Sequence, residues 1–133
     1  SSRLGQPKQL LAWRNQTLIE HTVQRQLALQ PGRVVVLLGA HFQQIEPVLK
    51  PYAVDITYHN QWKKGLGNSL AFGIQKIIPY PEWDGVLIVL SDQPLIDLSY
   101  LKEMVAEYRK HPEFIVATNY QGKPGVPAMI PKT

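Results

Sequence analysis

The sequence has no cysteine among its 133 residues, and this absence excludes several kinds of chemistry. Without thiols the chain forms no disulfide, no thiolate zinc site and no covalent intermediate on sulfur. Four histidines are present, but none has the HxxH or HExxH spacing of a metal site. No GxSxG elbow is present either, so hydrolase chemistry on a serine has little support. The lack of cysteine suits a cytoplasmic protein, which is the location we expect.

Long apolar runs and clustered positive charge are also missing. The longest apolar runs, 34–38 and 86–90, are far shorter than the roughly 20 residues that cross a bilayer, so no membrane partner is expected. The net charge is +4 and the pI about 9.4, yet the basic residues are scattered rather than arranged in a stripe. We therefore expect small phosphate ligands rather than nucleic acid.

Apolar periodicity and capping signals predict alternating helices and strands. Thr17 and Glu20 have the spacing of a capping box, which predicts a helix that ends near Gln30. The β-branched runs 34–38 and 86–90 predict fully buried strands. A cap at or next to Asn68 predicts another helix. Further strands are expected at 54–58 and 114–117, with a last strand in the short apolar stretch 128–130, and helices at 42–49 and from Ser99.

This order predicts an α/β fold with a doubly wound, mostly parallel, Rossmann-like sheet. We expect one domain that covers residues 1–133. Ligands of such sheets bind at the carboxyl ends of the strands. That edge would carry the segments 39–41, 59–60 and 91–92, so His41 and His59 could lie near it.

Asp92 is the first candidate functional residue, because it follows the apolar run 86–90. A carboxylate at a strand end is well placed to hold Mg²⁺ together with substrate phosphates. The alternative is an aspartate that stabilises a local turn before Pro94.

Two polar loops supply further candidates. Arg3, Gly5 and Lys8 precede the first helix, where backbone N–H groups and cations can face phosphate oxygens; the alternative is an ordinary solvated loop. In the loop 60–69, glycines permit close approach of a ligand, and polar side chains offer hydrogen bonds, although a turn followed by a helix cap also accounts for much of this pattern. The candidates in this loop are Asn60, Gly65, Gly67 and Ser69.

Several of these segments, in this order, resemble the MobA-like nucleotidyltransferases. SSRLG followed by PKQLL resembles the signature loop, with Leu4 where methionine is usual. HNQWKKGLGNSL resembles the family's Asn-Trp-Gly-Ser segment, and LSDQP resembles its metal-binding strand end. The resemblance covers nearly the whole chain. The family's first strand and its later acidic segment are not seen, so we expect the chain to be truncated at both ends.

Within the family, PKQLL, GLGNS and DQP are most similar to the molybdenum cofactor cytidylyltransferases. The resemblance implies transfer of CMP from CTP to the terminal phosphate of molybdopterin, with Mg²⁺ as cofactor and transient docking to a molybdoenzyme. It assigns catalysis to Arg3, Lys8 and Asp92, with Asp92 as the metal ligand. It assigns nucleotide binding to Ser2, Arg3, Gly5, Lys8, Asn60, Gly65, Gly67 and Ser69.

Two alternatives remain open. One is a sugar-1-phosphate or guanylyl nucleotidyltransferase of the same fold. The other is a non-catalytic accessory protein that binds the molybdenum cofactor.

Overall fold

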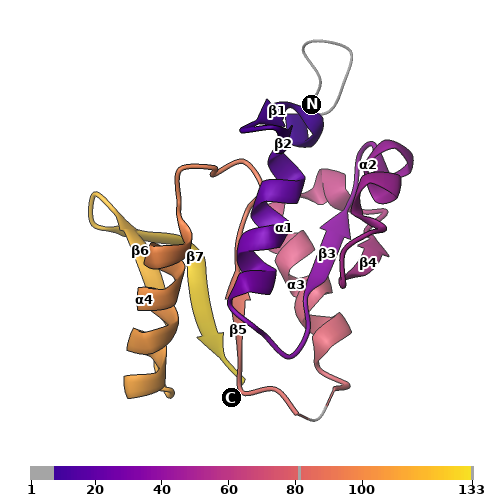
Figure 1. The fold of residues 1–133 in the computed structure, drawn as a ribbon. Helices are drawn as coiled ribbons and strands as arrows, with labels where there is room; N and C mark the ends of the chain where they lie inside the picture. The colour runs from indigo at the N-terminus through magenta and orange to yellow at the C-terminus, as the bar shows by residue number, and fades with distance from the viewer. Residues whose placement is uncertain (1–7, 81, 133) are drawn as a thin grey trace. The chain divides into compact units, whose positions relative to one another are not determined.

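The computed structural model describes residues 8–80 and 82–132 of the chain (Figure 1). The residue contacts divide the chain into two compact units, Ser1–Pro81 and Glu82–Thr133. Helices and strands alternate from α1 to β6, as the sequence predicts, whereas β1–β2 and β6–β7 are pairs of consecutive strands. Each unit is described by itself below.

The described residues of the first unit form two small sheets and three α-helices. β1 and β2 form an antiparallel hairpin. β3 and β4 pair in parallel, from Val35 opposite Asp55 to Leu38 opposite Tyr58, which confirms the prediction of parallel strands for this part of the chain. The elements are a 3₁₀ turn (Lys8–Leu10), β1 (Ala12–Trp13), β2 (Gln16–Thr17), α1 (Leu18–Ala28), β3 (Val35–Leu38), α2 (Phe42–Leu49), β4 (Asp55–Tyr58), a 3₁₀ turn (Trp62–Lys64) and α3 (Leu66–Ile77).

The predicted capping box is present at the start of α1. Thr17 Oγ1 accepts a bond from the Glu20 N–H at 3.2 Å, and Glu20 Oε1 accepts one from the Thr17 N–H at 3.2 Å. Tyr52 donates its hydroxyl hydrogen to Glu20 Oε2 at 2.7 Å. This bond lowers the pKa of Glu20, although partial burial opposes the shift, and it raises the pKa of Tyr52. The helix ends at Ala28, close to the predicted end.

Helices cover β3 on both faces, as its unbroken apolar sequence predicts. Leu38 belongs to a buried cluster whose other members come from α1 and α2, namely Ile19, Val23, Ile45 and Leu49. The next residue back, Leu37, faces α3 instead. A Cβ atom on Gly73 would lie 2.9 Å from Leu37 Cδ1, so α3 approaches the strand closely at this glycine.

The second unit is a three-stranded sheet with one helix against it. Its elements are β5 (Gly85–Ile88), α4 (Leu98–Lys110), β6 (Val116–Tyr120) and β7 (Lys123–Pro131). The strand order is β5–β7–β6, and both outer strands run antiparallel to β7. Among the described pairs, the prediction of parallel strands therefore fails here. β5 and β6 run in the same direction, but a reversed strand separates them.

Sequence patterns predicted only the end of β7 and missed its first part, where the prolines suggest a loop. We expected a turn-rich segment at 122–127 and a strand only in the short apolar stretch 128–130. Gln121 and Gly122 instead have φ values of 54° and 89°, and this pair of positive φ values closes a tight hairpin between β6 and β7. Pairing with strands on both sides then extends β7 from Lys123 to Pro131.

In the second unit, α4 lies beside β6 and β7 (Figure 1), and side chains of the helix and the sheet form a common core. Met104 and Tyr108 of α4 pack with Met129 of β7. Tyr108 also donates its hydroxyl hydrogen to the Asp84 carbonyl at 3.0 Å, next to the start of β5. No helix in the described parts of the two units is long and apolar enough to cross a membrane.

Candidate functional site

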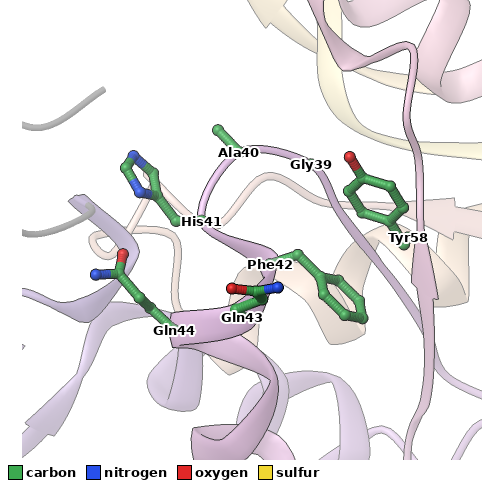
Figure 2. Close-up of a pocket in the computed structure, with 7 residues that line it drawn as sticks. All are labelled: Gly39, Ala40, His41, Phe42, Gln43, Gln44 and Tyr58. Carbon is green, nitrogen blue, oxygen red and sulfur yellow. The ribbon is translucent and has the colours of Figure 1, made fainter.

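A pocket of about 590 Å³ lies at the carboxyl ends of β3 and β4, where the sequence predicts a ligand edge. Figure 2 shows its residues: the side chains of His41 and Gln44 lie on one side of the start of α2, and the rings of Phe42 and Tyr58 on the other. The two rings meet edge to face, with centroids 5.0 Å apart. The lining is completed by Gly39, Ala40 and Gln43.

The turn that leads into α2 shapes this pocket. His41 is the residue before the helix and has a left-handed backbone, with φ 65° and ψ 24°. Its carbonyl accepts hydrogen bonds from the N–H groups of Gln44 and Ile45, at 3.0 and 3.1 Å. The turn therefore presents polar amides and an imidazole beside two aromatic rings, a combination that suits a planar, polar ligand.

The loop after β4 carries the predicted nucleotide-binding residues of the first unit. Asn60 is exposed and directly follows the buried His59. Gly65 precedes α3 with φ 103°, a conformation that strongly favours glycine. Gly67 and Ser69 lie in the first turn of α3, where the Ser69 N–H donates to the Gly65 carbonyl at 3.2 Å. These candidates therefore gather around one loop and one helix start.

The prediction that Asn68 or its neighbour caps this helix is wrong. The helix begins earlier, at Leu66, with Gly65 as the capping residue. Asn68 instead lies inside the helix, and its Oδ1 is 3.0 Å from His59 Nε2.

The N-terminal candidates lie mostly at the edge of the described chain. Ser2, Arg3 and Gly5 fall outside the described residues. Lys8 opens the 3₁₀ turn Lys8–Leu10 and is exposed. Its role in binding phosphate remains a prediction.

In the second unit, Asp92 lies in the turn that follows β5, as its position after the apolar run predicts. Its carboxylate is exposed, and among the described residues it has neither a hydrogen bond nor an ion pair. It is therefore free to accept a cation. The described residues contain no group of three or more histidine, aspartate or glutamate side chains able to hold a metal. One carboxylate with substrate phosphates and water suffices for Mg²⁺, so the site fits such an ion.

Gln93 ties the Asp92 turn to the β6–β7 hairpin. Its Nε2 donates to Tyr120 Oη at 3.0 Å and to the Val126 carbonyl at 3.3 Å. Tyr120 in turn donates its hydroxyl hydrogen to the same carbonyl. The backbone next to Asp92 is thus fixed by side-chain contacts to another part of the sheet.

Comparison with known families shows which family contains this arrangement of loops. The MobA-like NTP transferase domain matches residues 1–133. This chain belongs to the MobA-like NTP transferase domain family.

Curated relatives of this MobA-like chain include the bifunctional protein GlmU of Francisella tularensis subsp. novicida (strain U112) and of subsp. tularensis (strain SCHU S4 / Schu 4). Each is 32% identical over 101 residues, which is 76% of this chain. The chain spans only 21% of the length of these relatives.

Solved structures with the same fold include Rv0371c from Mycobacterium tuberculosis H37Rv. It has a TM-score of 0.80 and 22% identity, over 98% of this chain and 65% of that one. Its complex with manganese has a TM-score of 0.76 and 19% identity, over 95% and 64%. A nucleotidyl transferase from Methanothermobacter thermautotroptrophicus has a TM-score of 0.66 and 24% identity, over 74% and 44%. These similarities confirm the α/β, Rossmann-like nucleotidyltransferase fold.

Sequence reasoning missed three features of this MobA-like domain. It placed the segment 39–41 at the ligand edge but did not foresee the pocket with Phe42 and Tyr58. It assigned no partner to His59, and it did not foresee the contacts of Gln93. Each feature joins residues far apart in the chain, and a local pattern carries no signal for such contacts.

Proposed function

We propose that the chain is the core of a nucleotidyltransferase that moves CMP from CTP to the terminal phosphate of the molybdenum cofactor and releases pyrophosphate. The observation that carries the proposal is the family match over residues 1–133, a range that contains the residues to which we assign phosphate and metal binding. The exposed Asp92 carboxylate at the end of β5 supports it. The proposal includes Mg²⁺, a cytoplasmic location and transient docking to a molybdoenzyme.

The chemistry needs alignment of two anions more than it needs a proton acceptor. A phosphate monoester has a second pKa of about 6 and is largely dianionic at neutral pH. Its oxygen can therefore attack the α-phosphorus of CTP without a general base. The new P–O bond forms as the bond to the β-phosphate breaks, and pyrophosphate leaves with the electron pair.

Each proposed residue then has a distinct task. Arg3 and Lys8 bind the β- and γ-phosphates and neutralise the charge that develops on pyrophosphate. Asp92 holds the divalent cation, which when bound would polarise the phosphate oxygens. The remaining residues contact the nucleotide or the pterin through backbone N–H groups and polar side chains, namely Ser2, Gly5, Asn60, Gly65, Gly67 and Ser69.

A second candidate is transfer to another phosphate acceptor, such as a sugar 1-phosphate, or transfer of another nucleotide. The chain is similar to GlmU proteins, and this similarity does not identify the base or the acceptor that the chain uses. Both candidates are therefore tested. The same residues would act on either acceptor.

The test measures pyrophosphate release by the intact protein, with CTP, GTP or UTP and either the molybdenum cofactor or a sugar 1-phosphate. We expect the highest kcat/KM with CTP and the molybdenum cofactor. Nucleotide binding without turnover would instead support a non-catalytic accessory protein. A higher kcat/KM with another base or acceptor would identify the second candidate.

Two substitutions test the residue roles. Asp92→Ala and Lys8→Ala should each slow transfer at least about a hundredfold, since one lost charge-stabilising contact typically costs about 3 kcal/mol of barrier. The matched controls are Glu103→Ala and Lys50→Ala, which remove exposed charges elsewhere. Near-normal turnover in either test variant would refute its assigned role.

A further inference from the structure

His59 differs from its neighbours because its side chain is buried. It is 2% exposed, whereas Tyr58 and Asn60 on either side are exposed. Its backbone N–H donates to the Leu38 carbonyl at 2.8 Å, which extends the pairing of β3 and β4 by one residue. His59 is therefore fixed at the end of the strand pair, where the polar loop begins.

The side chain of His59 joins this strand end to α3. Its Nε2 lies 3.0 Å from Asn68 Oδ1, and its ring centroid lies 4.4 Å from that of Phe72. Residues 68 and 72 are four apart in a helix, so they present one face to the imidazole. With Asn68 Oδ1 as the acceptor, Nε2 carries the hydrogen. Nδ1 is buried and has no hydrogen-bond partner within the described residues, so the bond to Asn68 orients the ring.

The loop 60–67, in which we include the first two residues of α3, is thus held at both of its ends. Its helical end needs such support, because Gly65 offers no side chain to cap α3 and no side-chain bond caps the helix there. Gly65, with a φ of 103°, also places a residue without a side chain, and therefore with wide backbone freedom, between the loop and the helix. The contact from His59 restricts this freedom from outside the loop.

We propose that His59 and Asn68 form a positioning pair that holds the loop 60–67 in the conformation that receives the nucleotide. The proposal rests on the proposed function, because it takes this loop as part of the nucleotide site. Neither residue touches a reacting atom in this role. The pair acts through the placement of Asn60, Gly65 and Gly67.

Two substitutions of His59 separate the bond from the bulk of the ring. In His59→Gln the amide nitrogen can reach the position of Nε2, so the bond to Asn68 is retained. In His59→Asn the amide nitrogen falls near the position of Nδ1, so the bond is lost. Both variants lose the ring contact with Phe72. Asn68→Ala removes the acceptor, and Gln75→Ala, at an exposed position of the same helix, is its control.

The experiment measures two quantities in the intact protein: hydrogen exchange of the amides of 61–69 without nucleotide, and the Kd for CTP with Mg²⁺ by calorimetry. His59→Asn and Asn68→Ala should exchange about tenfold faster and bind CTP about tenfold more weakly, as expected for one lost hydrogen bond. His59→Gln and Gln75→Ala should stay within about twofold of wild type. KM should rise in step with Kd while kcat changes little.

Unchanged exchange in His59→Asn and Asn68→Ala would overturn the positioning pair itself. Faster exchange with an unchanged Kd would overturn its role toward the nucleotide. If His59→Gln behaves like His59→Asn, the ring contact and not the bond holds the loop, which also overturns the proposal. Failure of the proposed function gives a different result, because the wild type would then bind no CTP, GTP or UTP while the exchange pattern still reports on the pair.

Discussion

Replacement of Gly85 by alanine tests how closely α4 packs on β5. A Cβ atom at this position would lie 2.6 Å from Tyr108 Oη and 2.8 Å from Tyr108 Cζ. Tyr108 cannot simply move away, because it is 6% exposed and its hydroxyl is bonded to the Asp84 carbonyl. The added methyl group must therefore displace a buried ring and break that hydrogen bond.

The magnitude follows from three contributions. Overpacking of a buried site costs about 1–3 kcal/mol, and loss of the Tyr108 hydrogen bond adds about 1 kcal/mol. Alanine recovers roughly 0.5–1 kcal/mol, because it restricts the unfolded chain more than glycine does. We expect the free energy of unfolding to fall by about 2 kcal/mol. With an m-value of about 1–2 kcal/mol per M urea, the midpoint of unfolding should fall by about 1–2 M.

The assay is urea unfolding followed by circular dichroism, with Gly32→Ala as the matched control. A Cβ atom at Gly32 would meet no atom within 4 Å, so this variant should be unchanged or slightly more stable. The Gly85→Ala change is then repeated in a Tyr108→Leu background, where the smaller side chain leaves room for the methyl group. An equal loss of stability in both backgrounds would refute the contact as the cause.

Three further predictions concern other contacts. The hydrogen bond from Tyr52 lowers the pKa of Glu20. The ionised carboxylate should therefore stabilise the fold above the ordinary carboxyl pKa of about 4.3, and this stabilisation should be lost as the pH falls through the lower pKa of the folded protein. Glu20→Gln should remove this acid dependence in urea titrations, and an unchanged pH profile of stability would contradict the prediction. Thr17→Ala should lower the free energy of unfolding by about 1 kcal/mol through loss of the α1 cap. The control is Ser99→Ala, which removes an exposed hydroxyl in the first turn of α4, and equal midpoints for the two variants would count against the capping box. Gln93→Ala removes the contacts that hold the turn of Asp92, so it should weaken Mn²⁺ binding to the intact protein several-fold. Electron paramagnetic resonance measures the bound Mn²⁺, and unchanged binding would show that this side chain does not position the proposed metal site.

Predictions from sequence succeeded where neighbouring residues decide the structure. The start of α1 follows from Thr17 and Glu20, whose hydrogen bonds close within one turn. The span of α2 was predicted as 42–49 and is Phe42–Leu49. The position of Asp92 after β5 also followed from a local rule, since a buried apolar strand must deliver its next residue to a sheet edge.

Predictions failed where distant partners decide the structure. The prolines of β7 argue against a central strand, but β5 and β6 both pair with it. Asn68 has a side chain typical of a helix cap. His59 nevertheless offers it a partner nine residues away, and the conformation of Gly65 lets the helix begin earlier. Pairing across the fold outweighed local preference in both cases.

In the proposed nucleotide site, the adjacent polar residues His59 and Asn60 have different tasks. The two residues follow β4 together, and the sequence predicts nucleotide binding for Asn60 but only a place near the same edge for His59. The structure buries one against α3 and exposes the other. A buried side chain gains rigidity from its contacts but cannot meet a ligand, whereas an exposed one can meet a ligand only if something else holds its backbone in place. His59 directly precedes Asn60. The contacts that fix His59 therefore also fix the position of the Asn60 backbone. Substitution of the buried residue should therefore impair binding at the loop even though its own side chain never reaches the nucleotide.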